Sequence, residues 1–455
     1  MTEQGGRTTL ITATAPTPNG PLHLGHLSGP YIAADIAARA ARRRGQRVVA
    51  FSGVDPNQNY VVTKAIAEGR SVQEVLDTYQ TDMRVAFERA RVEYDVFVQP
   101  DVDTDYRDAV AGLIGHLVAS GAATIAETTV MVCGDCDRTM HHAYVGGNCP
   151  TCGLGSGGGT CEGCGGFNTG ATMRDARCSQ CGSAPAPRTV AIPVLDMEKY
   201  RDQLAEVWAR AVLPPRVRDL IGSHLAWGLP TVPLAYPTDW GIELAGTVPS
   251  SIAGQRVDVW VEMGLGMLYA TARHIDPTAA GVDDYLAAWR NVDGGWHFLG
   301  IDNAFYFAVL FPALFAALGV TGGKLGGMVV NEFYRLDGLK FSTSRKHAIW
   351  ANEFLAVSDP ALLRLYLSWD RPDSYESDFT EDGYRAFVAL LEQYRAGKAL
   401  AELEPVLSAQ NLDRAERALE LPYFSPALAL RCLLGHEPGN VRAADLLRLL
   451  TAEPR

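Results

Sequence analysis

Hydrophobic positions follow two periods along this chain, one typical of buried strands and one typical of amphipathic helices. Residues Thr8–Ala13 are rich in β-branched side chains, as a strand is, and the turn-forming stretch Pro16–Gly20 follows them. A helical pattern then runs from Leu22 to Arg44, and Val48–Phe51 is a second strand-like run. Strand, glycine-containing loop, helix and strand in this order predict an α/β fold with a doubly wound, Rossmann-type parallel sheet.

A second α/β half is predicted to begin near residue 257. Three runs have the composition of strands and a fourth that of a buried helix: Val257–Val261, Trp296–Leu299, Gly327–Asn331 and Asn303–Leu318. From Asn352 to the end the pattern is helical, apart from a loop at about Trp369–Phe379. The sequence therefore predicts a helical C-terminal region after the second half of the sheet.

Between the two halves, from about Val130 to Pro187, glycine and cysteine dominate, and Leu204–Leu229 is again helical in pattern. Eight of the nine cysteines form four CxxC pairs: Cys133/Cys136, Cys149/Cys152, Cys161/Cys164 and Cys178/Cys181. Such pairs in a cytoplasmic chain predict zinc ligands rather than disulfides, and four pairs are enough for two closed structural sites. The ninth cysteine, Cys432, stands in an apolar helical stretch and is predicted to be a core thiol.

Composition narrows the function classes. Of 455 residues, 40 are basic and 52 acidic, which gives a net charge of −12 and disfavours an extensive nucleic-acid interface, although a local patch is enough for RNA contact. The charge and the missing recognition helix also disfavour a zinc-finger DNA binder. The chain has neither a signal peptide nor an apolar run long enough to cross a bilayer, so we predict a cytoplasmic protein without a membrane partner.

Two histidines follow the first strand and turn, in the motif His23-Leu24-Gly25-His26. At spacing i, i+3 the imidazoles share one side of the first helical turn, and that turn has free backbone N–H groups for an anion. Gly25 leaves room for a nucleotide against the backbone. The pattern alone also fits a pair of core or surface histidines; its position after a strand and turn favours phosphate binding.

Two further features suggest charged ligands. The loop Lys340–Arg345 carries two cations and small hydroxyl residues, which could clamp a leaving pyrophosphate, although an ordinary solvated loop has the same composition. Asp55 lies just past the second strand. It could cap the next helix, but the carboxyl end of a strand favours a ligand-binding role.

Both motifs, in this order, resemble the HIGH and KMSKS signatures of class I aminoacyl-tRNA synthetases. The surrounding sequence resembles the methionyl enzymes in particular, and the likeness runs from about residue 8 to about residue 385. The matching segments are Pro18–His26, Pro214–Val217, Thr238–Ile242, Val259–Trp260, His297–Asp302, Lys340–Trp350 and Arg371–Phe379.

The resemblance implies a nucleotidyl-transferase fold whose first and second halves span residues 1–115 and 244–350. An insertion at 116–243 would contain the zinc knuckles (130–187), and 351–455 would be helical. It also implies attack of an amino-acid carboxylate on ATP, with Mg²⁺ and two structural Zn²⁺ ions as cofactors. The zinc pairing would be nested, with the outer site formed by the first and last cysteine pairs.

Site residues carried over from the family fall into three groups. The catalytic residues would be His23, His26, Lys340 and Arg345. ATP would contact Pro18, Asn19, Gly20, Gly25, Gly300, Asp302, Ser342, Thr343 and Ser344. The amino acid would contact Ala15, Thr17, Asp55, Trp260, Met263, Gly264, Met267, Asn303 and Phe307, with Asp55 on its ammonium group.

The chain departs from the family pattern in the amino-acid pocket. Met263 replaces an alanine and Phe307 a histidine, and Thr343 replaces the second lysine of KMSKS. Extra bulk narrows the pocket, so we expect a small amino acid such as glycine; the alternative is a repacked core that still admits methionine. Only about 70 residues follow the family-like region, fewer than a full anticodon-binding domain needs.

Three functions are compatible with these features. The first is an amino-acid ligase of specialised metabolism that esterifies an N-hydroxylated amine, as in hydrazine formation, with a separate cupin partner. The second is a genuine synthetase that charges tRNA, which the altered pocket disfavours. The third is a non-catalytic paralogue, which the retained His23, His26, Lys340 and Asp55 disfavour.

Overall fold

The computed structural model describes residues 8–246, 248–320, 325–341, 347–397, 405–436 and 438–453. Its centre is a five-stranded parallel sheet in the order β16-β15-β1-β2-β3. The strands are β1 (Thr8–Ala13), β2 (Val48–Gly53), β3 (Val96–Val98), β15 (Val292–Gly300) and β16 (Leu325–Asn331). The predicted doubly wound sheet is confirmed, and β1 of the first half pairs directly with β15 of the second half.

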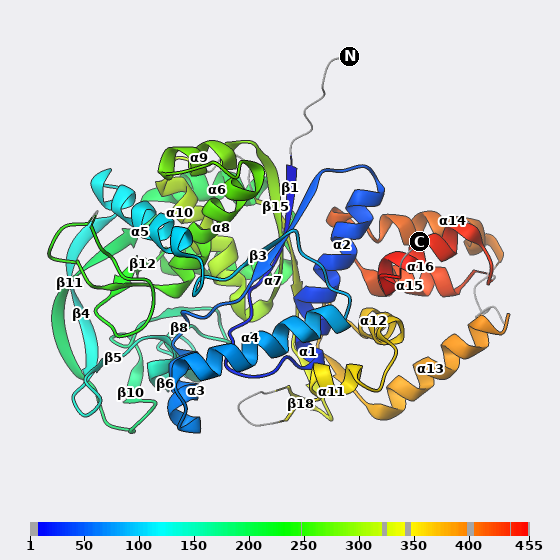
Figure 1. Cartoon of the computed structure of the whole chain (residues 1–455), viewed down its shortest axis with the longest axis horizontal. Helices are drawn as coiled ribbons and strands as arrows, with labels where there is room; N and C mark the ends of the chain where they lie inside the picture. Colours follow the sequence, from blue (N-terminus) through cyan, green and yellow to red (C-terminus); the bar gives the residue numbers. More distant parts are fainter. Residues whose placement is uncertain are drawn as a thin grey trace, which may run out of the picture.

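Successive side chains of β1 point to opposite faces of the sheet, and apolar residues on both faces require cover. Leu10 packs into one hydrophobic core and Ile11 into another, and both are fully buried. Helices α5 (Thr104–Ala119), α8 (Val259–Ile275) and α10 (Phe311–Ala317) belong to the first core, and α2 (Ile32–Arg43) belongs to the second. Figure 1 shows these helices on opposite sides of the central strands.

The predicted helix from Leu22 to Arg44 is present but interrupted. It consists of a short turn α1 (Leu24–His26), a π turn over Leu27–Tyr31 and α2. Gly29 leaves helical geometry inside the π turn, next to Pro30, which has no N–H to donate. The interruption separates the histidine motif from the regular helix behind it.

The strand predicted at Val257–Val261 is wrong beyond its first residue. Only Arg256–Val257 (β14) is extended, and it pairs with Ala235–Tyr236 (β13). Helix α8 begins at Val259 because the Asp258 carboxylate caps it, accepting from the N–H groups of Trp260 at 3.0 Å and Val261 at 3.4 Å. A short apolar run does not distinguish a strand from a buried helix.

The insertion between the halves is built on antiparallel strands. A long hairpin joins β4 (Thr124–Cys133) and β11 (Ala186–Asp196). The insertion also contains short strands: β5 (Arg138–Thr139), β6 (Val145–Asn148), β7 (Gly155–Gly157), β8 (Gly159–Thr160), β9 (Phe167–Asn168), β10 (Arg174–Cys178) and β12 (Thr231–Pro233). The helical stretch predicted after it is two helices, α6 (Arg201–Arg210) and α7 (Pro215–Trp227).

The helical C-terminal region is confirmed. The helices of this region are α11 (Ala351–Leu355), α12 (Pro360–Trp369), α13 (Glu381–Arg395), α14 (Pro405–Arg417), α15 (Pro426–Leu434) and α16 (Val441–Thr451). A small sheet connects it to the second half of the chain and consists of β17 (Tyr334–Leu336), β18 (Leu339–Lys340) and β19 (Ser377–Phe379). Cys432 is buried in α15, as predicted. Helices α3 (Tyr60–Glu68), α4 (Val72–Arg89) and α9 (Val282–Arg290) complete the fold. Among the described helices, none has the length and apolarity to cross a bilayer.

A buried ion pair ties the C-terminal region to the sheet domain. Arg364 of α12 is fully buried, and its Nη2 lies 2.6 Å from the Asp35 carboxylate of α2. The same guanidinium donates to the carbonyl oxygens of Leu450 and Ala90. Because every side of this cation is hydrogen-bonded to a different element, removing either partner would leave a buried charge.

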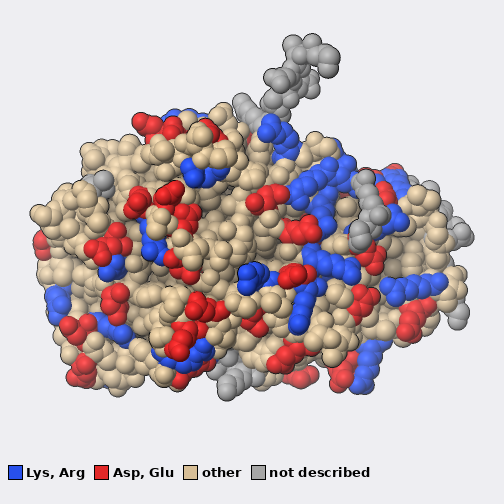
Figure 2. Space-filling model, in the orientation of Figure 1, with Lys and Arg blue, Asp and Glu red and all other residues tan. Residues whose placement is uncertain are grey.

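Charges of both signs are interspersed over the face shown in Figure 2, and basic side chains gather over α2. The arginines of this helix are paired within the chain. Arg39 contacts Asp35 at 2.9 Å, and Arg43 contacts Glu416 at 2.7 Å. Acidic partners reduce the field that this group of cations presents to a polyanion.

Candidate active site

A cleft of about 520 Å³ opens at the carboxyl ends of β1, β2 and β15. Parallel α/β sheets bind ligands at this edge, where the strand order reverses. The predicted residues that line the cleft come from both halves of the chain: Ala15, Thr17, Asn19, Gly20, His23, Gly25, His26, Asp55, Trp260, Gly300, Asp302, Asn303 and Lys340. Pro18 is not among the lining residues.

His23 and His26 form a closed pair at one end of the cleft. Their rings stack with centroids 3.6 Å apart. The His23 Nδ1 accepts from the His26 backbone N–H at 3.2 Å, and the His26 Nδ1 accepts from the His23 backbone N–H at 3.1 Å. Because each Nδ1 is an acceptor, the proton of each neutral ring is on Nε2, which leaves two N–H donors for a ligand.

Burial keeps both rings neutral. Desolvation lowers the pKa of His26 to about 4. It lowers the pKa of His23 well below its ordinary value as well, and His26 and Lys340 act in the same direction. Neutral imidazoles donate hydrogen bonds without adding fixed charge, which suits a group that stabilises charge as it develops on a phosphate.

The prediction that backbone N–H groups of this turn form the anion site is wrong for three of them. The N–H groups of His23 and His26 are bonded to the imidazoles, and that of Leu24 donates to the Ile349 carbonyl at 3.0 Å. Gly25 lines the cleft and also has a packing role. A Cβ there would lie 3.0 Å from the His23 ring and 3.5 Å from Phe341, so glycine lets the histidine pair close.

Lys340 is held at the other side of the cleft. Its ammonium lies 2.8 Å from the Glu162 carboxylate and 3.7 Å from the centre of the Phe333 ring. Glu162 belongs to the insertion, between two cysteines of one CxxC pair. The other predicted residues of this loop, Ser342, Thr343, Ser344 and Arg345, lie outside the described residues.

Asp302 and Gly300 occupy the end of β15. Burial raises the pKa of Asp302, and nearby Lys340 opposes that shift. A Cβ on Gly300 would lie 2.5 Å from Asp302 Oδ1, so glycine is needed for the carboxyl to fold back against the strand end. The carboxyl therefore faces the cleft, where a hydroxyl donor of a ligand could reach it.

Asp55 follows β2 and is 6% exposed. Thr17 donates to its Oδ2 at 3.2 Å, and its own N–H donates to the Pro16 carbonyl. Burial raises the pKa of Asp55 to about 7, because the cost of desolvating the charged carboxylate exceeds the stabilisation that Thr17 and His142 give it. A cationic ligand would therefore stabilise the ionised form of this buried carboxylate.

Beside Asp55 the cleft narrows to a small pocket of about 30 Å³. Met263, Met267 and Phe307 line it, and the Phe307 ring is held by Phe311 at a centroid distance of 4.7 Å. Gly264, predicted to contact the ligand, instead faces Phe311 and Leu314, where a Cβ would be 2.8 Å from the nearer ring. Its role is close packing of α8 on α10.

Trp260 lies above this pocket, stacked on Tyr306 with ring centroids 3.7 Å apart and planes 4° from parallel. The Tyr306 hydroxyl accepts from the Thr160 backbone N–H at 3.0 Å. The stack therefore links α8, the π turn before α10 and the zinc-knuckle insertion. A ligand in the cleft would meet a rigid aromatic wall.

Sequence reasoning missed a buried pair between the insertion and α8. His142 Nε2 lies 2.7 Å from Asp258 Oδ2, and both residues line or border the cleft. Burial alone would lower the pKa of His142, but Asp258 and Asp55 together raise it above its ordinary value. The partners are 116 positions apart, so only the fold brings them together.

Glu262 and its neighbours are the second set of residues that sequence reasoning passed over. Glu262 is 2% exposed and lines the small pocket next to Asp55. Asn57 donates to its Oε1 at 2.9 Å. Burial raises the pKa of Glu262 to about 8, and Asp55 contributes to that shift. The one available signal was a glutamate inside an otherwise apolar helix.

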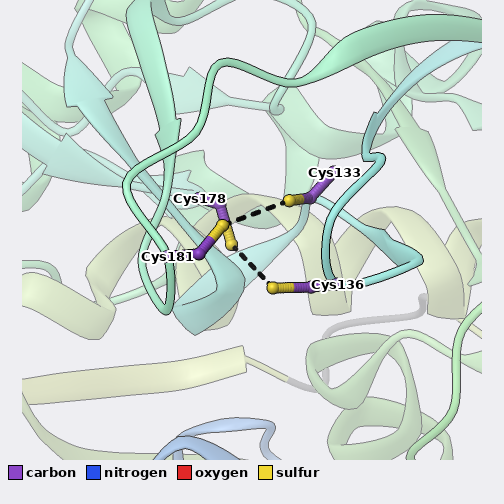
Figure 3. A group of neighbouring side chains, drawn as sticks. All are labelled: Cys133, Cys136, Cys178 and Cys181. Atoms are coloured by element: carbon purple, nitrogen blue, oxygen red, sulfur yellow. Dashed lines mark hydrogen bonds between the residues drawn. The ribbon is translucent and has the colours of Figure 1, made fainter.

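The eight paired cysteines form two tetrads. Cys133, Cys136, Cys178 and Cys181 make one, and Cys149, Cys152, Cys161 and Cys164 make the other. Figure 3 shows the outer tetrad, with thiols from two distant loops facing one another. The expected nested arrangement is confirmed.

Sulfur spacing in the tetrads fits a tetrahedral metal. Contacts of 3.5 Å (Cys133–Cys181), 3.8 Å (Cys136–Cys178) and 3.7 Å (Cys149–Cys164) join the pairs. Four thiolates at about 2.3 Å from zinc would be roughly 3.8 Å from one another. Three of the four CxxC pairs are followed by a glycine with positive φ, between 71° and 79°, which the tight turn requires. Both sites could hold zinc with no position left open for water.

Removing zinc is expected to unfold the insertion. Purified protein should contain about two zinc ions per chain, and strong chelation should expose residues 124–196 to protease, because few apolar side chains hold that segment together. Cys149→Ser should lower the zinc content to about one and have the same local effect. Metal analysis and limited proteolysis measure both; zinc-free protein with unchanged protease resistance would contradict a structural role.

Comparison with known proteins agrees with this architecture. The family model described as "tRNA synthetases class I (M)" matches residues 9–389. The methionine–tRNA ligase of Thermococcus kodakarensis is 30% identical over 394 residues, which cover 83% of this chain and 52% of that protein. That of Thermomicrobium roseum is 30% identical over 377 residues, 81% of this chain and 63% of that protein.

The chain spans about half the length of most curated relatives it matches. In structure it resembles Mycobacterium tuberculosis methionyl-tRNA synthetase in complex with methionyl-adenylate, with a TM-score of 0.68 and 17% identity over 96% of this chain and 82% of that one. A low identity supports only the shared fold. The family match, which spans most of the chain, goes further: this chain belongs to the class I tRNA synthetases of the methionyl type.

Proposed function

We propose that this chain activates a small amino acid with ATP to form an aminoacyl adenylate, and then passes the acyl group to an acceptor other than tRNA. The observation that carries the first step is the pair of neutral imidazoles, whose Nε2–H groups have no partner among the described residues, in one cleft with a buried carboxylate. The retained His23, His26, Lys340 and Asp55 disfavour a non-catalytic paralogue.

The proposed reaction begins with the substrate ammonium on Asp55 and the triphosphate against the histidine pair. A carboxylate oxygen attacks the α-phosphorus, the bond to the bridging oxygen of the β-phosphate breaks, and pyrophosphate leaves. The two Nε2–H groups stabilise charge on the phosphate oxygens, and Lys340 neutralises the leaving pyrophosphate. Mg²⁺, which would enter with ATP, would offset part of the negative charge of the phosphates. No protein nucleophile takes part.

Support for a small amino acid comes from the pocket beside Asp55. The centre of a water-sized group can move through about 30 Å³ of this pocket, so it holds a short side chain of a few atoms without rearrangement. Met263, Met267 and Phe307 supply the bulk that limits it. Glycine or another short amino acid fits this space; methionine would have to displace packed side chains.

For the second step we propose an N-hydroxylated amine as acceptor, in ester formation of the kind that precedes hydrazines, with a separate cupin partner. This part rests on the resemblance and on the altered pocket. The competing proposal is a tRNA-charging enzyme, which the relatives named methionine–tRNA ligases favour.

Pyrophosphate exchange across all amino acids tests the first step, and acyl transfer tests the second. We expect exchange with small amino acids and ester formation with an N-alkylhydroxylamine, but no acylation of total tRNA. Methionine as the best substrate together with acylated tRNA would overturn both the amino-acid and the acceptor proposals. A protein that exchanges with no amino acid is a non-catalytic paralogue.

The pKa of Asp55 predicts the pH dependence of substrate binding. Below about pH 7 its carboxyl is protonated and cannot pair with an ammonium group; above that pH it is ionised. The KM for the amino acid should therefore fall as pH rises from 5.5 to 7.5, by roughly tenfold per unit in the steepest part. Exchange kinetics across this range measure it, and a KM that rises with pH would contradict the assignment.

The contact between Glu162 and Lys340 predicts a modest gain on its removal. Glu162→Gln frees the ammonium for phosphate, and because both side chains are partly exposed, the effect should be about two- to fivefold. We expect the KM for ATP to fall by that factor in exchange assays. Glu206→Gln, on the exposed side of α6, is the control and should change nothing. A higher KM for ATP in Glu162→Gln would show that the glutamate assists binding instead.

A further inference from the structure

One carboxyl in the small pocket lacks a hydrogen-bond partner. Glu262, on α8, is 2% exposed; its Oε1 accepts from Asn57, while its Oε2 is shielded from solvent and has no partner. The Tyr106 hydroxyl is a weak donor that lowers the pKa of this carboxyl, but it does not reach Oε2 with ordinary hydrogen-bond geometry. A buried polar atom left without a partner is unfavourable, so such an atom in a binding pocket indicates a ligand that completes it.

The residue one turn earlier shows what a purely structural carboxyl looks like here. Asp258 is also buried, but both its oxygens are used: Oδ1 caps α8, and Oδ2 contacts His142. Both carboxyls come from the start of the same helix. Glu262, unlike Asp258, therefore has an oxygen left for a ligand in the pocket.

Three hydroxyl groups around the pocket are already bonded within the protein. The Thr12 hydroxyl pairs with His297 at 2.7 Å, the Ser52 hydroxyl donates to the Ala13 carbonyl at 3.1 Å, and Thr14 donates to the Phe298 carbonyl at 3.4 Å. The rest of the lining near Glu262 is apolar, with Met263, Met267 and Phe307 among it. The Glu262 oxygen is therefore the acceptor that the pocket offers to a substrate side chain.

We propose that the amino acid activated here has a short side chain that ends in a hydrogen-bond donor, a hydroxyl or an ammonium group, which Glu262 Oε2 accepts. The inference rests on the proposed function and narrows it: Asp55 receives the α-ammonium, and Glu262 receives the side chain. The small size of the pocket keeps that side chain short, so the donor is placed one carbon from Cα. Because burial raises the pKa of the Glu262 carboxyl, the form that accepts this hydrogen bond is the ionised one, which a bound cationic or donor group favours.

A substrate without the donor leaves the Glu262 oxygen unpaired once water is excluded. Sites built around such a hydrogen bond reject apolar isosteres strongly. Serine and 2-aminobutyrate form a matched pair, because they differ only by a hydroxyl in place of a methyl group. We expect the exchange kcat/KM of the protein to favour serine or 2,3-diaminopropionate over 2-aminobutyrate by at least about tenfold, and over glycine as well.

The test is pyrophosphate exchange with these four amino acids, on the unaltered protein and two variants. In Glu262→Gln the amide oxygen can still accept from Asn57, so the amide NH₂ faces the pocket and opposes a donor; the preference should fall at least tenfold. In Glu262→Met the preference should reverse toward 2-aminobutyrate. Glu206→Gln is the matched control. The ratio of serine to 2,3-diaminopropionate distinguishes a hydroxyl from an ammonium donor.

The outcomes separate this inference from the proposed function. Exchange that favours glycine or 2-aminobutyrate, with the same ranking in Glu262→Gln, overturns the donor subsite and leaves adenylate formation intact. Exchange with no amino acid overturns both. If Glu262→Met does not fold, Glu262→Gln decides, because it keeps the shape of the side chain and its bond to Asn57.

Discussion

His26→Asn is expected to lower kcat for adenylate formation by about 10²- to 10³-fold, the usual loss on removing one preorganised donor from a developing charge. The reason lies in the two nitrogens of the ring. Nδ1 accepts from the His23 backbone N–H at 3.1 Å, and Nε2–H remains for the phosphate. An asparagine oxygen can take the place of Nδ1 but offers no donor at the position of Nε2. The KM values should change little.

The same substitution separates a catalytic from a structural role. Because His26→Asn keeps the acceptor that closes the turn, its melting temperature should stay close to that of the parent protein. His26→Ala loses both functions and should be slower and less stable. His274→Ala, at the exposed end of α8, is the control and should leave exchange unchanged. A full kcat in His26→Asn would mean that the imidazole pair only shapes the loop.

Asp55→Asn is the second large effect. The substitution removes the anion that pairs with the substrate ammonium while it keeps the size of the side chain and an oxygen for Thr17. We expect the KM for the amino acid to rise by about 10- to 10²-fold, since a charged hydrogen bond in a buried site contributes about 1.5–3 kcal/mol. The pH dependence of KM between 5.5 and 7.5 should disappear with it.

Asp55→Asn should make the protein more stable at pH 8 although it lowers the activity. The pKa of Asp55 is raised by burial to about 7, so the empty fold favours the neutral carboxyl. The charged form costs stability, and that cost is absent at low pH, grows from about pH 4 and is complete above about pH 7. Asp55→Asn avoids it and should melt at a higher temperature at pH 8 but not at pH 4. A variant that is inactive and also less stable at pH 8 would point to misfolding.

Local sequence patterns were sufficient for much of this architecture. The parallel sheet, the two four-cysteine sites and the histidine motif follow from signals within a few residues, such as CxxC spacing and a strand followed by a turn; the nested pairing of the cysteines was implied by the family resemblance. The strand expected at Val257–Val261 failed because a short apolar run suits either structure, and the Asp258 cap decides in favour of a helix.

Interactions between distant residues were beyond those patterns. Glu262 and Asn57 are 205 positions apart, and His142 and Asp258 are 116 apart, so neither pair has a local signature. The contact of Glu162 with Lys340 likewise joins a zinc knuckle to the second half of the sheet. Burial was also invisible: a glutamate in an apolar helix becomes a ligand candidate only when its environment is known.

The most direct test of adenylate formation follows an oxygen atom. The protein is given ATP, Mg²⁺ and the best amino acid of the exchange panel, labelled with ¹⁸O in its carboxylate, and the released AMP is analysed by mass spectrometry after the acyl group is transferred to hydroxylamine. Attack by the carboxylate on the α-phosphorus predicts one ¹⁸O atom in AMP and an equal amount of pyrophosphate. Unlabelled AMP, or ADP with labelled inorganic phosphate, would contradict the account.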